Sequence, residues 1–139
     1  MNLARPVALI VDDNAGFLRV VQRLLAEDPG GFDVHTAETG DEALSFLERR
    51  APFVDAPRPA FAVLDFHLPD MDAPEIVAHI RQRADISSLP LMVISQASWP
   101  EDEVAAIQAG CDRFSVKPSD IDELHGMIVR FWRDVASHG

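Results

Sequence analysis

The sequence predicts an α/β protein with a doubly wound parallel sheet of five strands and helices on both faces. Short apolar segments rich in Val, Ile and Leu alternate five times with segments whose apolar residues recur at helical spacing. This alternation is typical of parallel sheets, because each strand needs a long crossover, usually a helix, before the next parallel strand. The 139 residues are enough for one such domain.

The first strand and helix are followed by a sequence that ends the helix. We predict a buried strand over residues 6–11, and Asn14 is placed to cap the helix that follows. The sequence Pro-Gly-Gly at 29–31 ends this helix, and residues 32–36 form a short second strand. The apolar face of the helix consists of Phe17, Leu18, Val21, Leu24 and Leu25.

The middle of the chain contains the most buried predicted strand. Residues 39–41 precede a second helix, and residues 51–59, which include three prolines, form an ordered loop or small insertion. The third strand covers residues 60–64 and stops at the carboxylate of Asp65. Pro74 suits the first turn of a third helix. The apolar faces of these two helices are Ala43, Leu44, Phe46 and Leu47, and Ile76, Val77 and Ile80.

The last two units follow the same order. Residues 90–94 form the fourth strand, and residues 98–101 are a capping box before a helix that Gly110 ends. Residues 111–116 form the fifth strand, and Ser119 is placed to cap the last helix. The apolar residues of these two helices are Val104, Ala105 and Ile107, and Ile121, Leu124 and Ile128. The large aromatic residues that we expect to serve packing are Trp99, Phe131 and Trp132.

Composition excludes several classes of function. The net charge of −11 repels nucleic-acid phosphates and anionic lipid, and the few basic residues form no stripe, so we expect no direct nucleic-acid binding. No apolar run approaches the roughly 18 residues that a membrane span requires, so we expect no membrane insertion. The single Cys111 excludes an internal disulfide and fits a reducing, cytoplasmic compartment.

Polar side chains end four of the five predicted strands. Asp12 and Asp13 follow the first strand, Asp65 the third, Ser95 the fourth and Lys117 the fifth. Parallel strands end at one edge of the sheet, where open α/β sheets bind ligands. Three close carboxylates repel one another, and a cation is needed to keep them ionised. Oxygen ligands favour Mg²⁺, which leaves coordination positions for a phosphoryl oxygen, while the lysine and the serine can hold its other oxygens.

This ordered set resembles the receiver domain of two-component response regulators. The resemblance covers residues 7–135 and implies a flavodoxin-like (βα)5 fold, with one receiver domain over residues 1–139 and no effector domain. The residues that carry it are Asp12-Asp13 after VALIV, Asp65 at the end of FAVLD, the following LPDMD, Ser95, Phe114 and the Lys117-Pro118 pair.

The resemblance implies a phosphoacceptor site. Asp65 would take a phosphoryl group from a phosphohistidine of a histidine kinase or phosphotransfer protein. Asp13, Asp65 and the backbone carbonyl of His67 would bind Mg²⁺ directly, and Asp12 would bind it through water or directly. Lys117 would pair with the phosphoryl group. Such a protein is not an enzyme beyond Mg²⁺-dependent self-phosphorylation and self-dephosphorylation.

The resemblance also implies a conformational switch. Ser95 would bond to the phosphoryl group and move inward, and Phe114 would swing into the vacated space, although a core phenylalanine explains Phe114 almost as well. The Lys117–Pro118 peptide would be cis. The face formed by the fourth helix, fifth strand and fifth helix would be read by a downstream protein, so that output is protein–protein contact or phosphorelay.

Three positions depart from the family pattern. Ala73 stands where Gly is usual, Gln96 replaces a small residue, and His67 lies two positions after Asp65. Our hypothesis is that Gln96 and His67 set the lifetime of the phosphorylated state. The insertion at residues 51–59 is longer than usual, and its role is not assigned.

Other interpretations remain open. The chain can be a receiver-fold binding module that works without phosphorylation. A Mg²⁺-dependent phosphatase with an aspartate nucleophile is disfavoured, because His67 occupies the position of its general acid. A flavin-binding protein needs a phosphate loop after the first strand, where DDNAGF places carboxylates. We expect surface positions for His35, His79 and His125, and loop or cap roles for Asp70 and Asp72.

Overall fold

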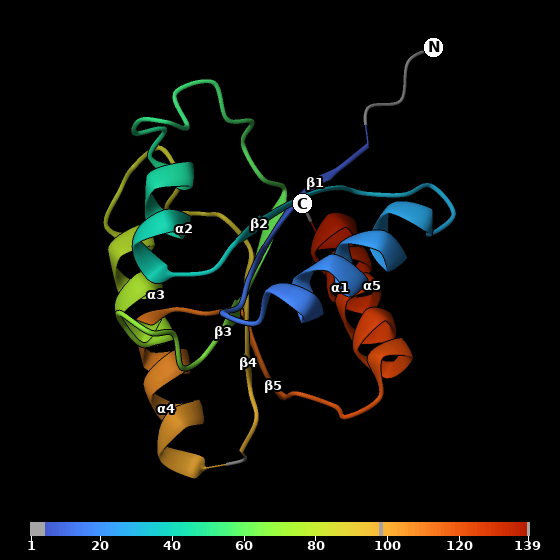
Figure 1. Cartoon of the computed structure of the whole chain (residues 1–139). Coiled ribbons are helices and arrows are strands. Elements are labelled where there is room, and N and C mark those ends of the chain that lie inside the picture. The colour runs from blue at the N-terminus through green and yellow to red at the C-terminus, as the bar shows by residue number, and fades with distance from the viewer. Residues whose placement is uncertain (1–4, 98, 139) are drawn as a thin grey trace.

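Five parallel strands form one sheet, with two helices on one face and three on the other (Figure 1). The structure, a computed structural model, describes residues 5–97 and 99–138. The strands are β1 (Val7–Val11), β2 (Asp33–Ala37), β3 (Phe61–Asp65), β4 (Leu91–Ser95) and β5 (Arg113–Val116). The helices are α1 (Ala15–Glu27), α2 (Gly40–Leu47), α3 (Ala73–Arg81), α4 (Pro100–Ala109) and α5 (Ile121–His138).

The strand order is β2-β1-β3-β4-β5, with every neighbouring pair parallel. The order reverses between β1 and β3, which is where open α/β sheets place their ligand site. The register aligns the carboxyl ends of the central strands, since Val11 pairs with Leu64 and Asp65 pairs with Ile94. The predicted α/β fold with a doubly wound five-stranded sheet is confirmed.

The central strands separate two hydrophobic cores. Alternate residues of a strand point to opposite faces, so Leu9, Leu64 and Val93 contribute to the core under α2, α3 and α4. Ile10, Val63 and Ile94 face α1 and α5 instead. Figure 1 shows α1 and α5 together on one side of the sheet and the other three helices on the opposite side. Burial on both faces explains why these strands are continuously apolar.

Most of the predicted helix ends are observed. The Asn14 side chain caps α1 by accepting a hydrogen bond from the Phe17 N–H at 3.0 Å. Gly110 ends α4 with φ of 117°, a left-handed conformation in which an added Cβ would lie 3.0 Å from the Arg81 side chain. The predicted cap Ser98 lies outside the described residues.

The cap of α5 was predicted at the wrong residue. Asp120, rather than Ser119, is at the start of the helix: its carbonyl accepts from the Leu124 N–H at 3.1 Å and its Oδ1 from the Asp122 N–H at 2.9 Å. The fifth strand also begins at Arg113 instead of residue 111. The Cys111 N–H is used instead to bond to the Ala106 carbonyl, at the end of the preceding helix.

Two other expectations are wrong. Trp99 is not a packing residue, because 58% of it is exposed beside the start of α4. The Lys117–Pro118 peptide is not cis; among the described residues, the cis peptide is Ala51–Pro52. The two predicted packing aromatics of α5 differ in burial: Phe131 is 1% exposed, and Trp132 is partly buried with its ring stacked on Phe61.

Residues 51–59 form an ordered loop, as predicted. Phe53 packs edge-on against Phe46 with ring centroids 5.6 Å apart, and Ala56 is buried. The Arg49 side chain donates a hydrogen bond to the Ala56 carbonyl at 2.8 Å. In the described part of the chain, no helix combines the length and apolar character needed to cross a bilayer.

Candidate functional site

The carboxyl ends of β1 and β3 bring three aspartates together. Carboxylate oxygens of Asp12, Asp13 and Asp65 lie within 4.8 Å of one another. Among the described residues, no other group of three or more His, Cys, Asp or Glu side chains is this close. Asp12 and Asp65 are buried, whereas Asp13 is exposed. The clustering predicted from strand ends is therefore observed.

Asp65 is the carboxylate of this cluster whose pKa is raised. Burial raises its pKa to about 6, the Asp12 carboxylate adds to the rise, and Asp13 adds a smaller part. Lys117 and His67 lower the pKa but do not compensate. A cation bound between the carboxylates would relieve the same repulsion. The donor set of hard oxygens therefore fits a divalent cation such as Mg²⁺.

Lys117 reaches the cluster from the end of β5. Its Nζ donates a hydrogen bond to Asp12 Oδ2 at 2.7 Å, and its side chain is 12% exposed. The Lys117 backbone N–H donates to the Ser95 carbonyl at 2.7 Å, which ties the two predicted site residues together. The ammonium group thus lies beside the carboxylate that is most buried in the cluster.

Asp12 has a different environment from its two neighbours. Its Oδ1 accepts the Asn14 N–H at 2.9 Å, and its Oδ2 accepts Lys117 Nζ. In the described residues, no donor bonds to the side chains of Asp13 or Asp65. Asp13 and Asp65 are accordingly the carboxylates with oxygens available to a bound ion.

A cavity of about 210 Å³ opens onto the cluster and is lined by Asp13, Asp65, His67 and Gln96. The His67 ring stands between two acids, with Nδ1 3.3 Å from Asp72 Oδ1 and Nε2 3.6 Å from Asp102 Oδ2. His67 therefore links the loop after β3 to the first turn of α4. Asp102 was missed by sequence reasoning, because it resembles any acidic residue at a helix start.

The two predicted switch residues lie on neighbouring strands. Ser95 ends β4, is 1% exposed, and its Oγ lies 3.5 Å from the Ala97 N–H. Phe114 of β5 is partly buried and packs against the core under α2, α3 and α4. Phe114 therefore contributes to the core in this conformation.

The remaining predicted surface residues lie away from the cluster. His79 Nε2 is 2.6 Å from Glu48 Oε2, His125 Nε2 is 3.2 Å from Asp28 Oδ1, and the His35 ring packs on Phe46. Asp70 is a capping residue, as expected, although it caps the N-terminus of α2 and not the helix that follows it in the chain, α3.

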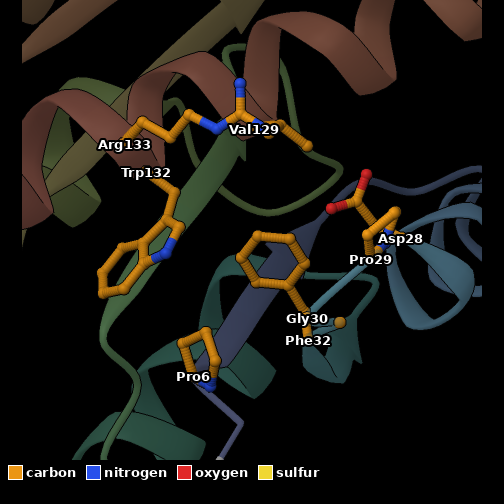
Figure 2. A pocket seen from close by; sticks show the side chains of 9 residues that line it. Pro6, Asp28, Pro29, Gly30, Phe32, Val129, Trp132 and Arg133 are labelled. Atoms are coloured by element: carbon orange, nitrogen blue, oxygen red, sulfur yellow. The ribbon is translucent and has the colours of Figure 1, made fainter.

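A second cavity, of about 190 Å³, lies at the amino ends of β1 and β2, opposite the acid cluster (Figure 2). It is bordered by Pro6 before β1, Phe32 before β2, and Trp132 and Arg133 of α5. This cavity contains none of the strand-end residues described above, so the chemistry of the acid cluster does not extend to it.

The doubly wound sheet, with an acid cluster and a lysine at the carboxyl ends of its strands, is the architecture of a receiver-type domain. The sequence profile of the response regulator receiver domain matches residues 8–129. The chain therefore belongs to the response regulator receiver domain family.

Several relatives are similar along most of the chain. The response regulator Rre1 of Synechocystis sp. is 32% identical over 127 residues, which cover 91% of this chain and 52% of Rre1. The response regulator Rcp1 of Synechocystis sp. is 26% identical over 134 residues, covering 94% of this chain and 91% of Rcp1. The chain thus spans about half the length of Rre1 but most of Rcp1.

Solved structures agree with this assignment. The phosphorylated cyanobacterial phytochrome response regulator RcpA superposes with a TM-score of 0.86 at 25% identity, over 95% of this chain and 96% of RcpA. The Mn²⁺-bound form of Rcp1 superposes with a TM-score of 0.79 at 26% identity, over 88% of each chain.

Proposed function

We propose that this chain accepts a phosphoryl group on Asp65 from a phosphohistidine of a histidine kinase or phosphotransfer protein. The observation that carries the proposal is the position of Asp65, at the end of β3 between two carboxylates and close enough to Lys117 for the ammonium to lower its pKa. The phosphorylated relative RcpA, whose fold matches over nearly the whole chain, supports it.

The transfer needs a nucleophile and positive charge. An Asp65 oxygen attacks phosphorus, the phosphorus–nitrogen bond to the donor histidine breaks, and the histidine keeps the electron pair. A pKa of about 6 leaves Asp65 ionised at neutral pH. Lys117 offers its ammonium to the phosphoryl oxygens as charge redistributes, and the hydroxyl of Ser95 offers a hydrogen bond.

Mg²⁺ is the proposed cofactor, and Asp13, Asp65 and the carbonyl of His67 are its proposed ligands. No backbone N–H of the described residues bonds to the His67 carbonyl, so that oxygen is available. Both oxygens of Asp12 already accept hydrogen bonds, which favours contact through water for this residue. When bound, the ion supplies positive charge to the phosphoryl oxygens. The Mn²⁺-bound form of Rcp1 supports a divalent ion in this family.

The proposed output is contact with a downstream protein through α4, β5 and α5, with no nucleic acid bound directly. Among the residues that the structure describes, four of the six exposed large hydrophobic residues lie on or beside α4 and β5: Trp99, Val104, Ile107 and Val116. Large apolar side chains left exposed on neighbouring elements support the proposal that a partner protein covers this face. We further propose that residues 1–139 act as one receiver domain in the cytoplasm.

Intact mass spectrometry after incubation with Mg²⁺ and acetyl phosphate tests the proposal. We expect the wild type to gain one phosphoryl group and Asp65→Asn to gain none. Asp70→Asn is a matched control in the same loop and is expected to be phosphorylated. If wild type gains no mass and binds no Mg²⁺, the chain is instead a binding module on a receiver fold.

If Mg²⁺ binds but acetyl phosphate does not react, the assay is repeated with phosphorylated histidine kinases as donors. Failure with every donor would contradict the phosphoacceptor proposal. Phosphorylation of Asp65→Asn as fast as wild type would show that another residue is the acceptor.

A further inference from the structure

We infer that Phe17 is a positioning residue for Lys117, because its ring holds the lysine ammonium beside the acid cluster through a cation–π contact. Lys117 Nζ lies 3.9 Å from the centre of the Phe17 ring while it donates to Asp12 at 2.7 Å. This inference rests on the proposed phosphoryl transfer, in which Lys117 is the catalytic cation.

The position of the ring is fixed by a closed circuit of contacts. Asp12 Oδ1 accepts the Asn14 N–H at 2.9 Å, and Asn14 Oδ1 accepts the Phe17 N–H at 3.0 Å. The Phe17 ring contacts Lys117, and the Lys117 ammonium donates a hydrogen bond to Asp12, which closes the circuit. The first turn of α1 and the end of β5 are thus joined through one carboxylate, although Phe17 and Lys117 are far apart in sequence.

The ring prevents Lys117 from leaving the cluster. A cavity of about 380 Å³ lies beside the lysine and is lined by residues that include Asn14, Gln96, Ser119 and Ile121. A lysine side chain has many rotamers, so its ammonium can turn into such a space unless something attracts it elsewhere. An aliphatic residue at position 17 would fill volume but present no negative π face.

A cation–π contact also suits a lysine that must change partner. The attraction of an ammonium to an aromatic face tolerates a change of direction better than a hydrogen bond does. Lys117 can therefore turn from Asp12 toward an incoming phosphoryl oxygen while it remains over the ring. Phe17 would in this way keep the ammonium close in both arrangements.

The inference predicts that loss of the Phe17 ring slows phosphorylation but does not weaken Mg²⁺ binding. Phe17→Leu should slow phosphorylation of Asp65 by acetyl phosphate roughly three- to tenfold, the loss expected for one partly buried cation–π contact. Mg²⁺ should bind the variant at least as tightly as it binds wild type, because a displaced ammonium repels the ion less. General disruption of the site would weaken both.

The experiment compares wild type with Phe17→Leu, Phe17→Tyr and Phe17→Trp, and with Ile121→Ala as a control lining the same cavity. It measures the phosphorylation rate, the Mg²⁺ affinity and the proton chemical shift of the Lys117 ε-methylene, which an aromatic ring above it moves upfield. We expect Tyr or Trp to keep the rate and the shift, Leu to lose both, and Ile121→Ala to keep both.

Equal rates for wild type and Phe17→Leu, or a normal Lys117 shift in wild type, would overturn the inference. So would a loss of rate shared by the aromatic variants. Should wild type take no phosphate from any donor, the proposed function fails, and the chemical shifts alone then decide whether Phe17 holds Lys117. Circular dichroism of each variant confirms that it is folded.

Discussion

Asp65 makes the stability of the metal-free protein depend on pH. Burial, followed by the neighbouring Asp12 carboxylate, raises its pKa from 3.8 to about 6, so the folded state holds the Asp65 proton more tightly than the unfolded state does. The folded state therefore pays no penalty from this group below pH 3.8, and stability falls as the pH rises toward 6. Above pH 6 the full penalty is present.

Asp65→Asn should remove this penalty. Without divalent metal, we expect the variant to be more stable than wild type by on the order of 1 to 3 kcal/mol above pH 7, with the gain disappearing near pH 4. Urea unfolding of both proteins in a chelating buffer across this range measures the difference. A difference that does not vary with pH would show that Asp65 has an ordinary pKa.

Gln96 and His67 line the same cavity as Asp65, and this position supports the hypothesis that they set the lifetime of a phosphoryl group on Asp65. Shorter side chains would admit water more freely, so Gln96→Ala and His67→Asn should each lose phosphate several-fold faster than wild type. Dephosphorylation is followed by intact mass after removal of the donor. Gln108→Ala, at an exposed position of α4, serves as the control, and unchanged rates for both site variants would reject the role.

At the scale of elements, α2 and the loop after β3 are joined by Asp70. Its two carboxylate oxygens accept the backbone N–H groups of Gly40 at 2.8 Å and Asp41 at 2.9 Å, at the N-terminus of α2. Loss of some hydration raises the pKa of the exposed Asp70 carboxyl, but the backbone hydrogen bonds outweigh this effect, so the pKa lies below its usual value. A carboxylate at a helix N-terminus also interacts favourably with the helix dipole.

Asp70→Ala should destabilise the protein by about 1 kcal/mol, the usual loss for a helix cap, whereas Asp70→Asn should lose less. Because the folded pKa is lowered, the contribution is present above pH 3.8 and is lost as the pH falls through the folded pKa. Chemical unfolding at pH 7 and at low pH measures it. Equal stability of wild type and Asp70→Ala at pH 7 would refute this capping role.

The α4 helix has the fewest buried residues of the five helices, counted over the residues that the structure describes. Ala106 is its buried residue among those described, and the apolar residues Val104 and Ile107 are about half exposed. A helix with little buried area is stabilised weakly by packing. Its first turn instead lies close to the loop after β3, where Asp102 Oδ2 is 3.6 Å from His67 Nε2. This position lets a small change at the cluster act on the proposed contact surface.

At the scale of the whole molecule, the proposed metal binding would be linked to folding. The three aspartates lie at the carboxyl ends of β1 and β3, which meet only when the sheet forms, so the unfolded chain has no comparable site. A ligand that binds only the folded state stabilises it by about 2.7 kcal/mol at a concentration one hundred times its Kd. An ion bound at the acid cluster should therefore increase the stability of the whole domain.

Addition of Mg²⁺ should raise the melting temperature in a saturable manner at pH 7.5. Asp13→Asn should reduce this effect strongly, because Asp13 is the exposed carboxylate with oxygens available to the ion. Differential scanning calorimetry over a Mg²⁺ series measures the shift, and the same ionic strength of Na⁺ is the control. An equal shift in wild type and Asp13→Asn would place the ion elsewhere.

Local patterns in the sequence determined the sheet and the acid cluster. Continuous apolar runs ended by polar residues specify buried parallel strands, and parallel strands share one edge, so Asp12, Asp13, Asp65 and Lys117 could be brought together from sequence alone. The Asn14 cap and the Gly110 stop were also predicted, because each acts on its own helix. Strand ends were placed less accurately, since hydrogen bonds across the sheet decide them.

Tertiary structure decided what depends on packing between distant segments. Whether the Phe17 ring meets Lys117, whether Asp70 caps α2 and whether His67 reaches Asp102 follow from how helices lie on the sheet, and no local pattern encodes these distances. The exposure of Trp99 has the same origin, because an apolar residue is buried only where another element covers it. The sequence thus determined which groups gather at the site, and three-dimensional packing determined which neighbours orient them.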